Sequence, residues 1–187
     1  RLSRVGSEMC IRDRGSSELR AGFSSNESNS PMYTCENIVS RFRDRKRSAN
    51  VVLCGTDCYA DAQSRGNIKS PFDGNVVCGF DTMEYMLDNT FSKLGIDTDR
   101  VDHPLLLTEP LCNPEYNRAQ MNELLFEAYQ VQSVNYGLDA LFSAYANNVR
   151  DNGLVVSAGR TTTAIVPLVQ GRGSVSYTHL TLPTKRI

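Results

Sequence analysis

The spacing of apolar residues along the chain predicts several short strands. β-branched residues are concentrated at positions 33–40 and 50–54, which is typical of strands. Leu105, Leu106 and Leu107 form a short apolar run after Pro104, as expected for a buried strand. Further extended segments are predicted at 76–77, 131–136, 153–157 and 161–169, and the segment 153–157 is expected to be a buried strand.

Apolar residues three or four positions apart predict three helices, and their alternation with strands predicts an α/β layered domain. The apolar positions are Phe80, Met83, Leu87, Phe91 and Leu94 in the first helix, Met121, Leu124, Leu125 and Ala128 in the second, and Leu138, Leu141, Phe142 and Tyr145 in the third. Gly95 follows the first helix, where glycine favours helix termination. Asn113 and Pro114 are predicted as the cap and first residue of the second helix.

Composition places the chain among ordinary globular domains. Its 187 residues, 40% hydrophobic and 22% charged, suffice for one domain with a real core. The net charge of −1 supplies no overall field that would recruit nucleic acid or a membrane. No apolar run is long enough to cross a bilayer, and the first residues lack the apolar core of a signal peptide. We therefore predict no membrane partner.

The cysteines are predicted to be reduced thiols. Six are present, and without a secretory signal a disulfide framework is not expected. Cys54 and Cys58 have a spacing that could begin a zinc site, but zinc needs two further ligands. Only His103 and His179 are available as histidine ligands, so no metal site is predicted.

Both ends of the chain read as translated adapter DNA. Residues 9–13 can be encoded by ATG TGT ATA AGA GAC, and the reverse complement of that string encodes Val-Ser-Tyr-Thr-His, which is the sequence of residues 175–179. The neighbouring residues resemble translated transposase-adapter sequence. Residues 1–14 and 175–187 are therefore interpreted as non-native tails and excluded from fold reasoning. Both flanks of the native gene would then be cut.

Three collinear segments resemble the actin family. Residues 15–23 are similar to its first phosphate-binding hairpin, and residues 103–110 with Asn113 and Pro114 are similar to the following strand and helix start. Residues 155–167, followed by Gly171, are similar to its second phosphate hairpin. The resemblance implies the N-terminal part of an actin-like ATPase (ribonuclease H-like) fold. The first lobe would span 15–150, with a small outer subdomain at about 24–72, and the second lobe would start at 151–174.

Several segments resemble one branch of that family, the class-five nuclear actin-related proteins, more than conventional actins. These segments are 68–73, 75–77, 101–104, 113–116 and 123–127. The resemblance implies a nuclear structural subunit of an inositol-requiring-80 type remodelling complex, acting in nucleosome remodelling, transcription regulation and DNA repair. Other remodeller subunits would be its partners. Two alternatives stay open: an active actin-like ATPase and a cytoskeletal filament protein.

The resemblance also implies a site for ATP or ADP, formed where two turns approach the phosphates. Small residues let backbone N–H groups converge on phosphate oxygens. The implied nucleotide-binding residues are Gly15, Ser16, Ser17, Leu19 and Arg20 in the first segment, and Ser157, Ala158, Gly159, Arg160 and Thr161 in the second. The family has lysine in place of Arg20 and glycine in place of Ser17.

The second phosphate segment departs from the family in ways that argue against hydrolysis. Actins have aspartate where this chain has Ser157 and Arg160, glycine at Thr161 and histidine at Ala164. Because a hard divalent cation prefers carboxylate oxygens, the magnesium site is doubtful.

Two other acidic residues bear on the same question. Asp139 stands where actins have the glutamine that positions water; it could act as a base, but a solvent-lining role is favoured. Asp13 falls in register with a magnesium-linked aspartate but belongs to the predicted tail. We therefore expect no catalytic residue, with nucleotide bound structurally.

A run of basic residues predicts a second contact surface. Residues 41–47 hold five cations and one aspartate, in a hairpin or loop of the outer subdomain. Such runs are usually solvated. Because the resemblance implies work beside nucleosomes, this loop is a candidate for contact with DNA. The residues concerned are Arg41, Arg43, Arg45, Lys46 and Arg47.

Overall fold

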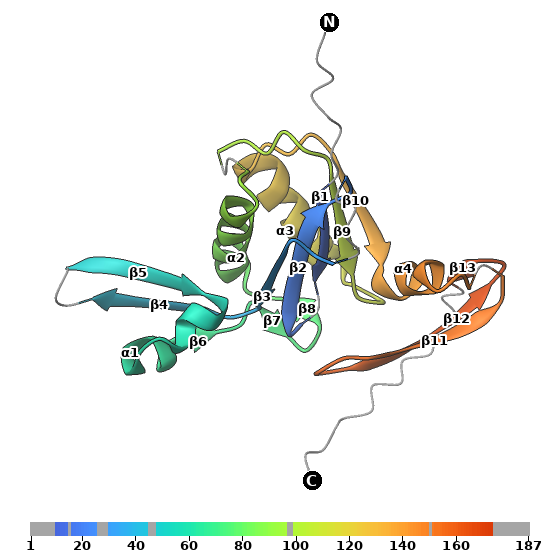
Figure 1. Cartoon of the computed structure of the whole chain (residues 1–187), viewed down its shortest axis with the longest axis horizontal. Helices are drawn as coiled ribbons and strands as arrows, with labels where there is room; N and C mark the ends of the chain where they lie inside the picture. Colours follow the sequence, from blue (N-terminus) through green and yellow to red (C-terminus); the bar gives the residue numbers. More distant parts are fainter. Residues whose placement is uncertain are drawn as a thin grey trace, which may run out of the picture.

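A five-stranded mixed sheet organises most of the chain in the computed structural model (Figure 1). The structure describes residues 10–14, 16–25, 30–44, 48–96, 99–149 and 151–173, with the backbone alone for 10–14. The sheet contains β1 (Cys10–Arg14), β2 (Glu18–Phe23), β3 (Tyr33–Glu36), β9 (Leu105–Glu109) and β10 (Val134–Leu138) in the order β10-β9-β1-β2-β3. β1, β9 and β10 are parallel, whereas β1, β2 and β3 are antiparallel. The expected α/β class is confirmed.

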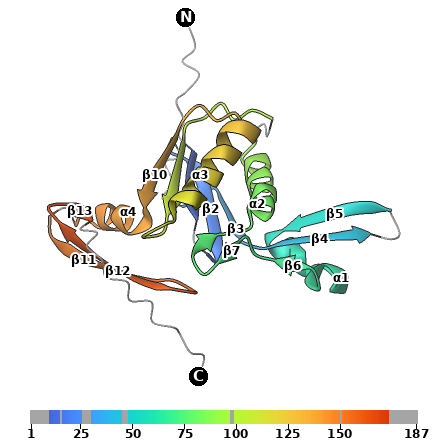
Figure 2. The same cartoon turned by 180° about the vertical axis from the view of Figure 1, so that it is seen from behind.

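The main core lies between this sheet and two helices, which Figure 2 shows from the other side. α2 (Phe80–Lys93) and α3 (Glu115–Glu123) supply most of the helical core residues, and a π-helical turn, η2 (Leu124–Ala128), continues α3. The fully buried residues include Met83, Leu87, Phe91, Leu105, Leu107 and Leu125. Gly95 follows the end of α2 with φ +73°, as its position predicted. Glycine has no Cβ, so it adopts this left-handed backbone conformation without a steric penalty.

A smaller sheet projects to one side of the main sheet (Figure 1). It has the order β5-β4-β6, formed by β4 (Val39–Asp44), β5 (Ala49–Cys54) and β6 (Ile68–Lys69), and is joined by η1 (Gly55–Tyr59) and α1 (Ala62–Arg65). The strand expected at 33–40 is in fact two strands. The buried Asn37 separates them, because its backbone N–H leaves the strand path and donates to Ser17 O at 2.9 Å.

Two hairpins and one helix surround the end of the main sheet. β7 (Phe72–Asp73) and β8 (Val76–Val77) form the first hairpin, which turns at Gly74 with φ +61°. β11 (Gly153–Ala158) and β12 (Thr163–Val169) form the second, to which the short β13 (Arg172–Gly173) is added. α4 (Asp139–Ala146) follows β10 directly and packs against the second hairpin through Ala140, Ala144, Val166 and Leu168.

Four local expectations are wrong. α4 buries Ala140 and Ala144, whereas Phe142 and Tyr145 are exposed, because small residues allow a close approach of the helix to β12. β11 is not a buried strand: Leu154 and Val156 are 63% and 59% exposed.

The other two corrections concern α3. Pro114 is itself the N-cap, and Asn113 turns its side chain to Glu109 instead of capping the helix. η2 is a π-helical turn with i→i+5 hydrogen bonds, so buried positions no longer recur every 3.6 residues. Ala128 is exposed for this reason.

The predicted N-terminal tail contributes a strand to the sheet. Of residues 1–14, the structure describes 10–14, which form β1 between β9 and β2. Strand pairing uses backbone groups that every residue except proline provides, so this placement requires no particular side chains. The interpretation of 1–14 and 175–187 as translated adapter stays a prediction; residues 1–9 and 175–187 lie outside the described part.

Three of the five described cysteines are enclosed near the junction of the two sheets. Cys35 and Cys58 are buried and Cys54 is partly buried, whereas Cys78 and Cys112 are exposed. All five are free thiols. Burial raises the pKa of Cys54 to about 12, and it raises the pKa values of Cys35 and Cys58. These three thiols therefore stay protonated at neutral pH and act as small packing groups.

Candidate functional site

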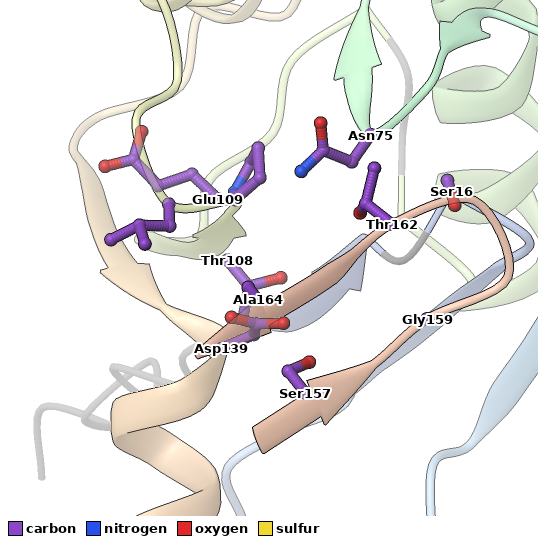
Figure 3. A pocket seen from close by; sticks show the side chains of 11 residues that line it. Ser16, Asn75, Thr108, Glu109, Asp139, Ser157, Gly159, Thr162 and Ala164 are labelled. Atoms are coloured by element: carbon purple, nitrogen blue, oxygen red, sulfur yellow. The ribbon is translucent and has the colours of Figure 1, made fainter. Parts of the chain in front are cut away.

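A polar hollow lies where β9 ends and the β11–β12 hairpin crosses over it (Figure 3). The space between its lining atoms, including the part open to solvent, is about 530 Å³. The lining residues come from five separate segments: Ser16; Asn75; Thr108, Glu109, Pro110 and Leu111; Asp139; and Ser157, Gly159, Thr162 and Ala164. Ligands of open α/β sheets commonly bind at the carboxyl ends of strands, which is where this hollow lies.

Both predicted phosphate segments reach this hollow. Ser16 enters from the turn before β2, and Ser157 and Gly159 enter from the β11–β12 hairpin. The hairpin turn is closed by a hydrogen bond from Gly159 N to Thr162 O of 2.9 Å. A Cβ on Gly159 would lie 3.0 Å from that carbonyl oxygen, so glycine permits the tight turn. Two segments from opposite ends of the described chain are thus brought to one place, as the resemblance implied.

A chain of hydroxyl groups joins these two segments directly. The Oγ atoms of Ser16 and Thr161 are 3.0 Å apart. Thr161 Oγ1 also donates to the carbonyl oxygen of Gly74, at 2.9 Å, in the β7–β8 turn. Thr161 is not among the lining residues, but it connects the two phosphate segments to a third element.

Other predicted nucleotide-binding residues lie outside the hollow. Leu19 is fully buried in the core, and Arg20 is exposed with its guanidinium 3.0 Å from Glu18. Ser17, Ala158 and Arg160 are not part of the lining. Gly15 lies outside the described residues. A role for these residues in nucleotide binding stays a prediction.

Two carboxylates line the hollow, and one of them, Glu109, is engaged in an ion pair. Glu109 is 7% exposed and is held by Arg118, whose Nε donates at 3.1 Å and whose Nη2 makes a second contact. Asn113 Nδ2 also donates to Glu109, at 3.3 Å. Hydrogen bonding to Glu109 raises the pKa of Arg118, which is therefore always cationic.

Asp139, the second carboxylate, accepts from the N–H of Ala140 at 2.6 Å. The positions that are acidic in actins hold Ser157 and Arg160. Among the described residues, no three His, Cys, Asp or Glu side chains gather as metal ligands.

Sequence reasoning did not assign several lining residues to the site. Thr108 and Glu109 stand at the carboxyl end of β9, so the rule for parallel strands could have found them. Asn75 and Thr162 occupy hairpin turns whose position depends on long-range packing. No local signal in the sequence marks these two residues.

The basic run forms part of the projecting sheet. Arg41 and Arg43 lie on β4 and are exposed, and Phe42 between them points to the other face. The Arg41 guanidinium lies 5.8 Å from the ring centre of Tyr85, and Arg43 Nη2 is 3.5 Å from Ser48 Oγ. Arg45, Lys46 and Arg47 lie outside the described residues. The hairpin expected for this run is confirmed by the pairing of β4 with β5.

Comparison with known proteins agrees with this arrangement. A model of the actin family matches residues 6–176. Actin-like protein arp5 of Schizosaccharomyces pombe is 44% identical over 165 residues, covering 88% of this chain and 22% of that protein. Actin-related protein 5 of Saccharomyces cerevisiae is 40% identical, and that of Homo sapiens is 36% identical. The chain spans 22% and 28% of their respective lengths. In the described part of the chain, no helix is long and apolar enough to cross a membrane.

Proposed function

The chain belongs to the actin family and is similar to its actin-related protein 5 members, and from this premise we propose that it is part of a nucleotide-binding structural subunit of a nuclear chromatin-remodelling complex of the inositol-requiring-80 type. The subunit holds ATP or ADP to stabilise its fold and does not depend on hydrolysis. Other remodeller subunits are its partners, and its work serves nucleosome remodelling, transcription regulation and DNA repair.

The observation that carries this proposal is the meeting of two hydroxyl-bearing turns at a hollow poor in free carboxylates. Ser16 and Ser157 offer donors for phosphate oxygens, and Gly159 allows the backbone to approach closely. Glu109 is occupied by Arg118. The first alternative, an active ATPase, needs acidic residues that organise a magnesium ion. Among the described residues such a group does not form.

We expect the full-length protein to bind ATP and ADP but to release phosphate slowly or not at all. The reason is that the second hairpin carries Ser157 and Arg160 where actins carry carboxylates. Equilibrium binding of labelled nucleotide and a phosphate-release assay measure the two properties separately. Ser157→Ala is expected to weaken nucleotide binding about ten- to hundredfold, the effect of one lost hydrogen bond to a charged group. Ser143→Ala on the outer side of α4 is the matched control.

Two results would contradict the proposal. Phosphate release at an actin-like rate would identify an active ATPase. The protein can also be affinity-purified from nuclear extract. Absence of a DNA-translocating motor subunit from the purified material would contradict the proposed role in remodelling. Sedimentation of the purified protein as polymers in the presence of ATP would favour the cytoskeletal alternative.

The exposed basic hairpin supports a contact with nucleosomal DNA as part of the same function. Arg41 and Arg43 are exposed at alternate positions of β4, and alternate residues of a strand share a face. The three residues of the basic run chosen for the test are Arg43, Arg45 and Arg47. Replacing the three by glutamine is expected to lower DNA affinity at low salt. It should also reduce the slope of log affinity against log salt by about two to three, because each phosphate contact contributes about 0.9 to that slope on duplex DNA.

The control for this measurement is a charge change elsewhere on the surface. Arg100 is exposed and paired with Asp102, so Arg100→Gln alters net charge without touching the hairpin. An unchanged affinity and salt slope in the triple variant would exclude the hairpin as a DNA contact. A loss of equal size in the Arg100 variant would show a nonspecific charge effect.

A further inference from the structure

The β4–β5 hairpin carries a serine at the end of its basic run. The hairpin extends away from the main sheet (Figure 1), and Ser48 is the residue just before β5. Its backbone has φ +51°, a left-handed value that belongs to a turn and not to a strand. Ser48 is exposed, as are Ala49 and Asn50 after it. An enzyme in solution can therefore reach the Ser48 hydroxyl.

Arg43 lies beside this hydroxyl. Its Nη2 atom is 3.5 Å from Ser48 Oγ, and both residues are exposed. Among the described residues, no carboxylate forms an ion pair with Arg43. Asp44, the acid of the basic run, is next to Arg43 on β4 and so points to the opposite face. A guanidinium has five N–H donors and no acceptor, so Arg43 can bind an acceptor-rich group placed on Ser48.

The sequence just before Ser48 is basic. Residues 45–47, which lie outside the described part, read Arg-Lys-Arg in the sequence. Protein kinases select substrates partly by charge pattern, and a kinase whose substrate groove carries carboxylates favours a serine that follows basic residues. Ser92 is also exposed, but it follows the uncharged residues 89–91. Ser48, unlike Ser92, therefore has the surroundings that a basic-directed kinase recognises.

We propose that Ser48 is a phosphorylation site of a protein kinase that selects basic sequences, and that its phosphate turns off the contact of the hairpin with DNA. The second part rests on the DNA contact proposed above. In the reaction, Ser48 Oγ attacks the γ-phosphorus of ATP and the bond from that phosphorus to the β-phosphate oxygen breaks, which releases ADP. The hydroxyl proton passes to a base of the kinase. The product is a phosphoserine within reach of Arg43.

The charge of this phosphate is large compared with that of the hairpin. Residues 41–47 hold five cations and one aspartate, a net charge of +4. Phosphoserine carries about −1.5 to −2 at neutral pH and offers three acceptor oxygens, so it cancels up to about half of that charge. Two of these oxygens can accept parallel hydrogen bonds from Arg43. Arg43 is then occupied by the protein's own phosphate, and the added charge repels the phosphates of DNA.

Modification of Ser48 is tested in the full-length protein. The protein is incubated with nuclear extract as the source of kinases and with ATP labelled in its γ-phosphate, and the labelled sites are mapped by mass spectrometry. We expect label on Ser48 in the wild type and in the matched control Ser92→Ala, and none at position 48 in Ser48→Ala. A wild-type protein labelled only at other residues would overturn the assignment of Ser48.

The effect on DNA binding is measured with protein phosphorylated by cyclic-AMP-dependent protein kinase, a kinase of this specificity. Ser48→Ala treated in the same way is the control for phosphate at other residues. We expect phosphorylation to lower the affinity for duplex DNA at low salt about tenfold or more, the effect of one lost contact to a charged group. The slope of log affinity against log salt should fall by about one to two, because each phosphate contact contributes about 0.9.

The pairing of the phosphate with Arg43 has a readout that does not involve DNA. The second pKa of phosphoserine is about 6 and can be followed by phosphorus NMR. Pairing with a cation favours the dianion, so this pKa should be lower in the wild type than in Arg43→Gln. The expected difference is about 0.2–0.7, the amount that an exposed ion pair supplies. Equal values in the two proteins would show that Arg43 does not hold the phosphate.

Failure of the switch and failure of the proposed DNA contact give different results. If phosphate on Ser48 leaves DNA affinity unchanged while the triple arginine variant loses affinity, the hairpin binds DNA but Ser48 does not control it. If neither change affects DNA affinity, the proposed DNA contact fails. The labelling and the phosphoserine pKa then still decide whether Ser48 is a modification site that pairs with Arg43.

Discussion

Replacing Arg118 by alanine is expected to destabilise the folded protein by about 2–4 kcal/mol, somewhat less than the cost of about 3–5 kcal/mol for breaking a fully buried ion pair. Glu109, its partner, has a side chain that is 8% exposed, so the carboxylate would be left charged and out of water. The expected loss of stability is reduced because the Arg118 side chain is 46% exposed and because Glu109 keeps its hydrogen bond from Asn113. The guanidinium also lies 5.5 Å from the ring centre of Tyr136, and that contact is lost too.

Chemical denaturation of the full-length protein measures this effect as a lower midpoint at an unchanged slope. Arg100→Ala is the control, because Arg100 and Asp102 form an ion pair with side chains 64% and 58% exposed. Its loss should change stability by less than about 1 kcal/mol. Equal effects of the two substitutions would contradict the structural argument, because burial of Glu109 is what distinguishes them.

The pair also matters for the chemistry of the hollow. Glu109 lines it, and in the variant this carboxylate would be free to turn toward a ligand. A free negative charge beside the phosphate position repels nucleotide. Arg118→Ala should therefore weaken nucleotide binding beyond its effect on folding, which a titration at a temperature well below the melting transition can separate.

Elements set by local patterns could be predicted from the sequence. α2 combines apolar residues at helical spacing with Gly95 after its end, and both the helix and its termination are confirmed. β9 was predicted from three leucines, and it extends two residues further because Thr108 and Glu109 continue to pair with β10. In each case the local preference and the tertiary packing favour the same conformation.

Burial could not be predicted where it depends on partners far away in the sequence. The spacing of α4 favours a buried face of Leu138, Leu141, Phe142 and Tyr145. The helix instead buries Ala140 and Ala144 against Val166 and Leu168, with Leu141 partly buried beside them, and leaves Phe142 and Tyr145 exposed. Leu154 and Val156 look like residues of a buried strand, yet they are exposed on the outer face of β11. A sequence pattern shows which residues can be buried, and the packing partners decide which of them are.

The candidate site was predictable to the extent that the resemblance covers it. Ser16, Ser157 and Gly159 meet in the hollow, whereas Leu19 belongs to the core and Arg20 pairs with Glu18. A motif gives the segment, but the direction of each side chain follows from its strand register. The contact of Thr161 with Gly74 depends on the packing of two hairpins, so no segment of the sequence reveals it alone.

Gly55→Ala is the second substitution with a large expected effect. Gly55 is buried and has φ +62°, and a Cβ built on it would overlap the Sγ atom of Cys35. A left-handed alanine costs about 1–2 kcal/mol, and overpacking a well-filled core costs about 1–3 kcal/mol. The sum, about 2–5 kcal/mol, should appear as a lower denaturation midpoint of the full-length protein.

Gly95→Ala separates the two contributions, because Gly95 has φ +73° but a Cβ there would meet nothing within 4 Å. It should cost only the conformational part, about 1–2 kcal/mol. Adding Cys35→Ala to Gly55→Ala removes the overlapping sulfur, so the double variant should recover about 1 kcal/mol or more relative to additivity. If Gly55→Ala costs no more than Gly95→Ala, the Cys35 side chain can turn away. The junction of the two sheets would then be less tightly packed than the buried thiols indicate.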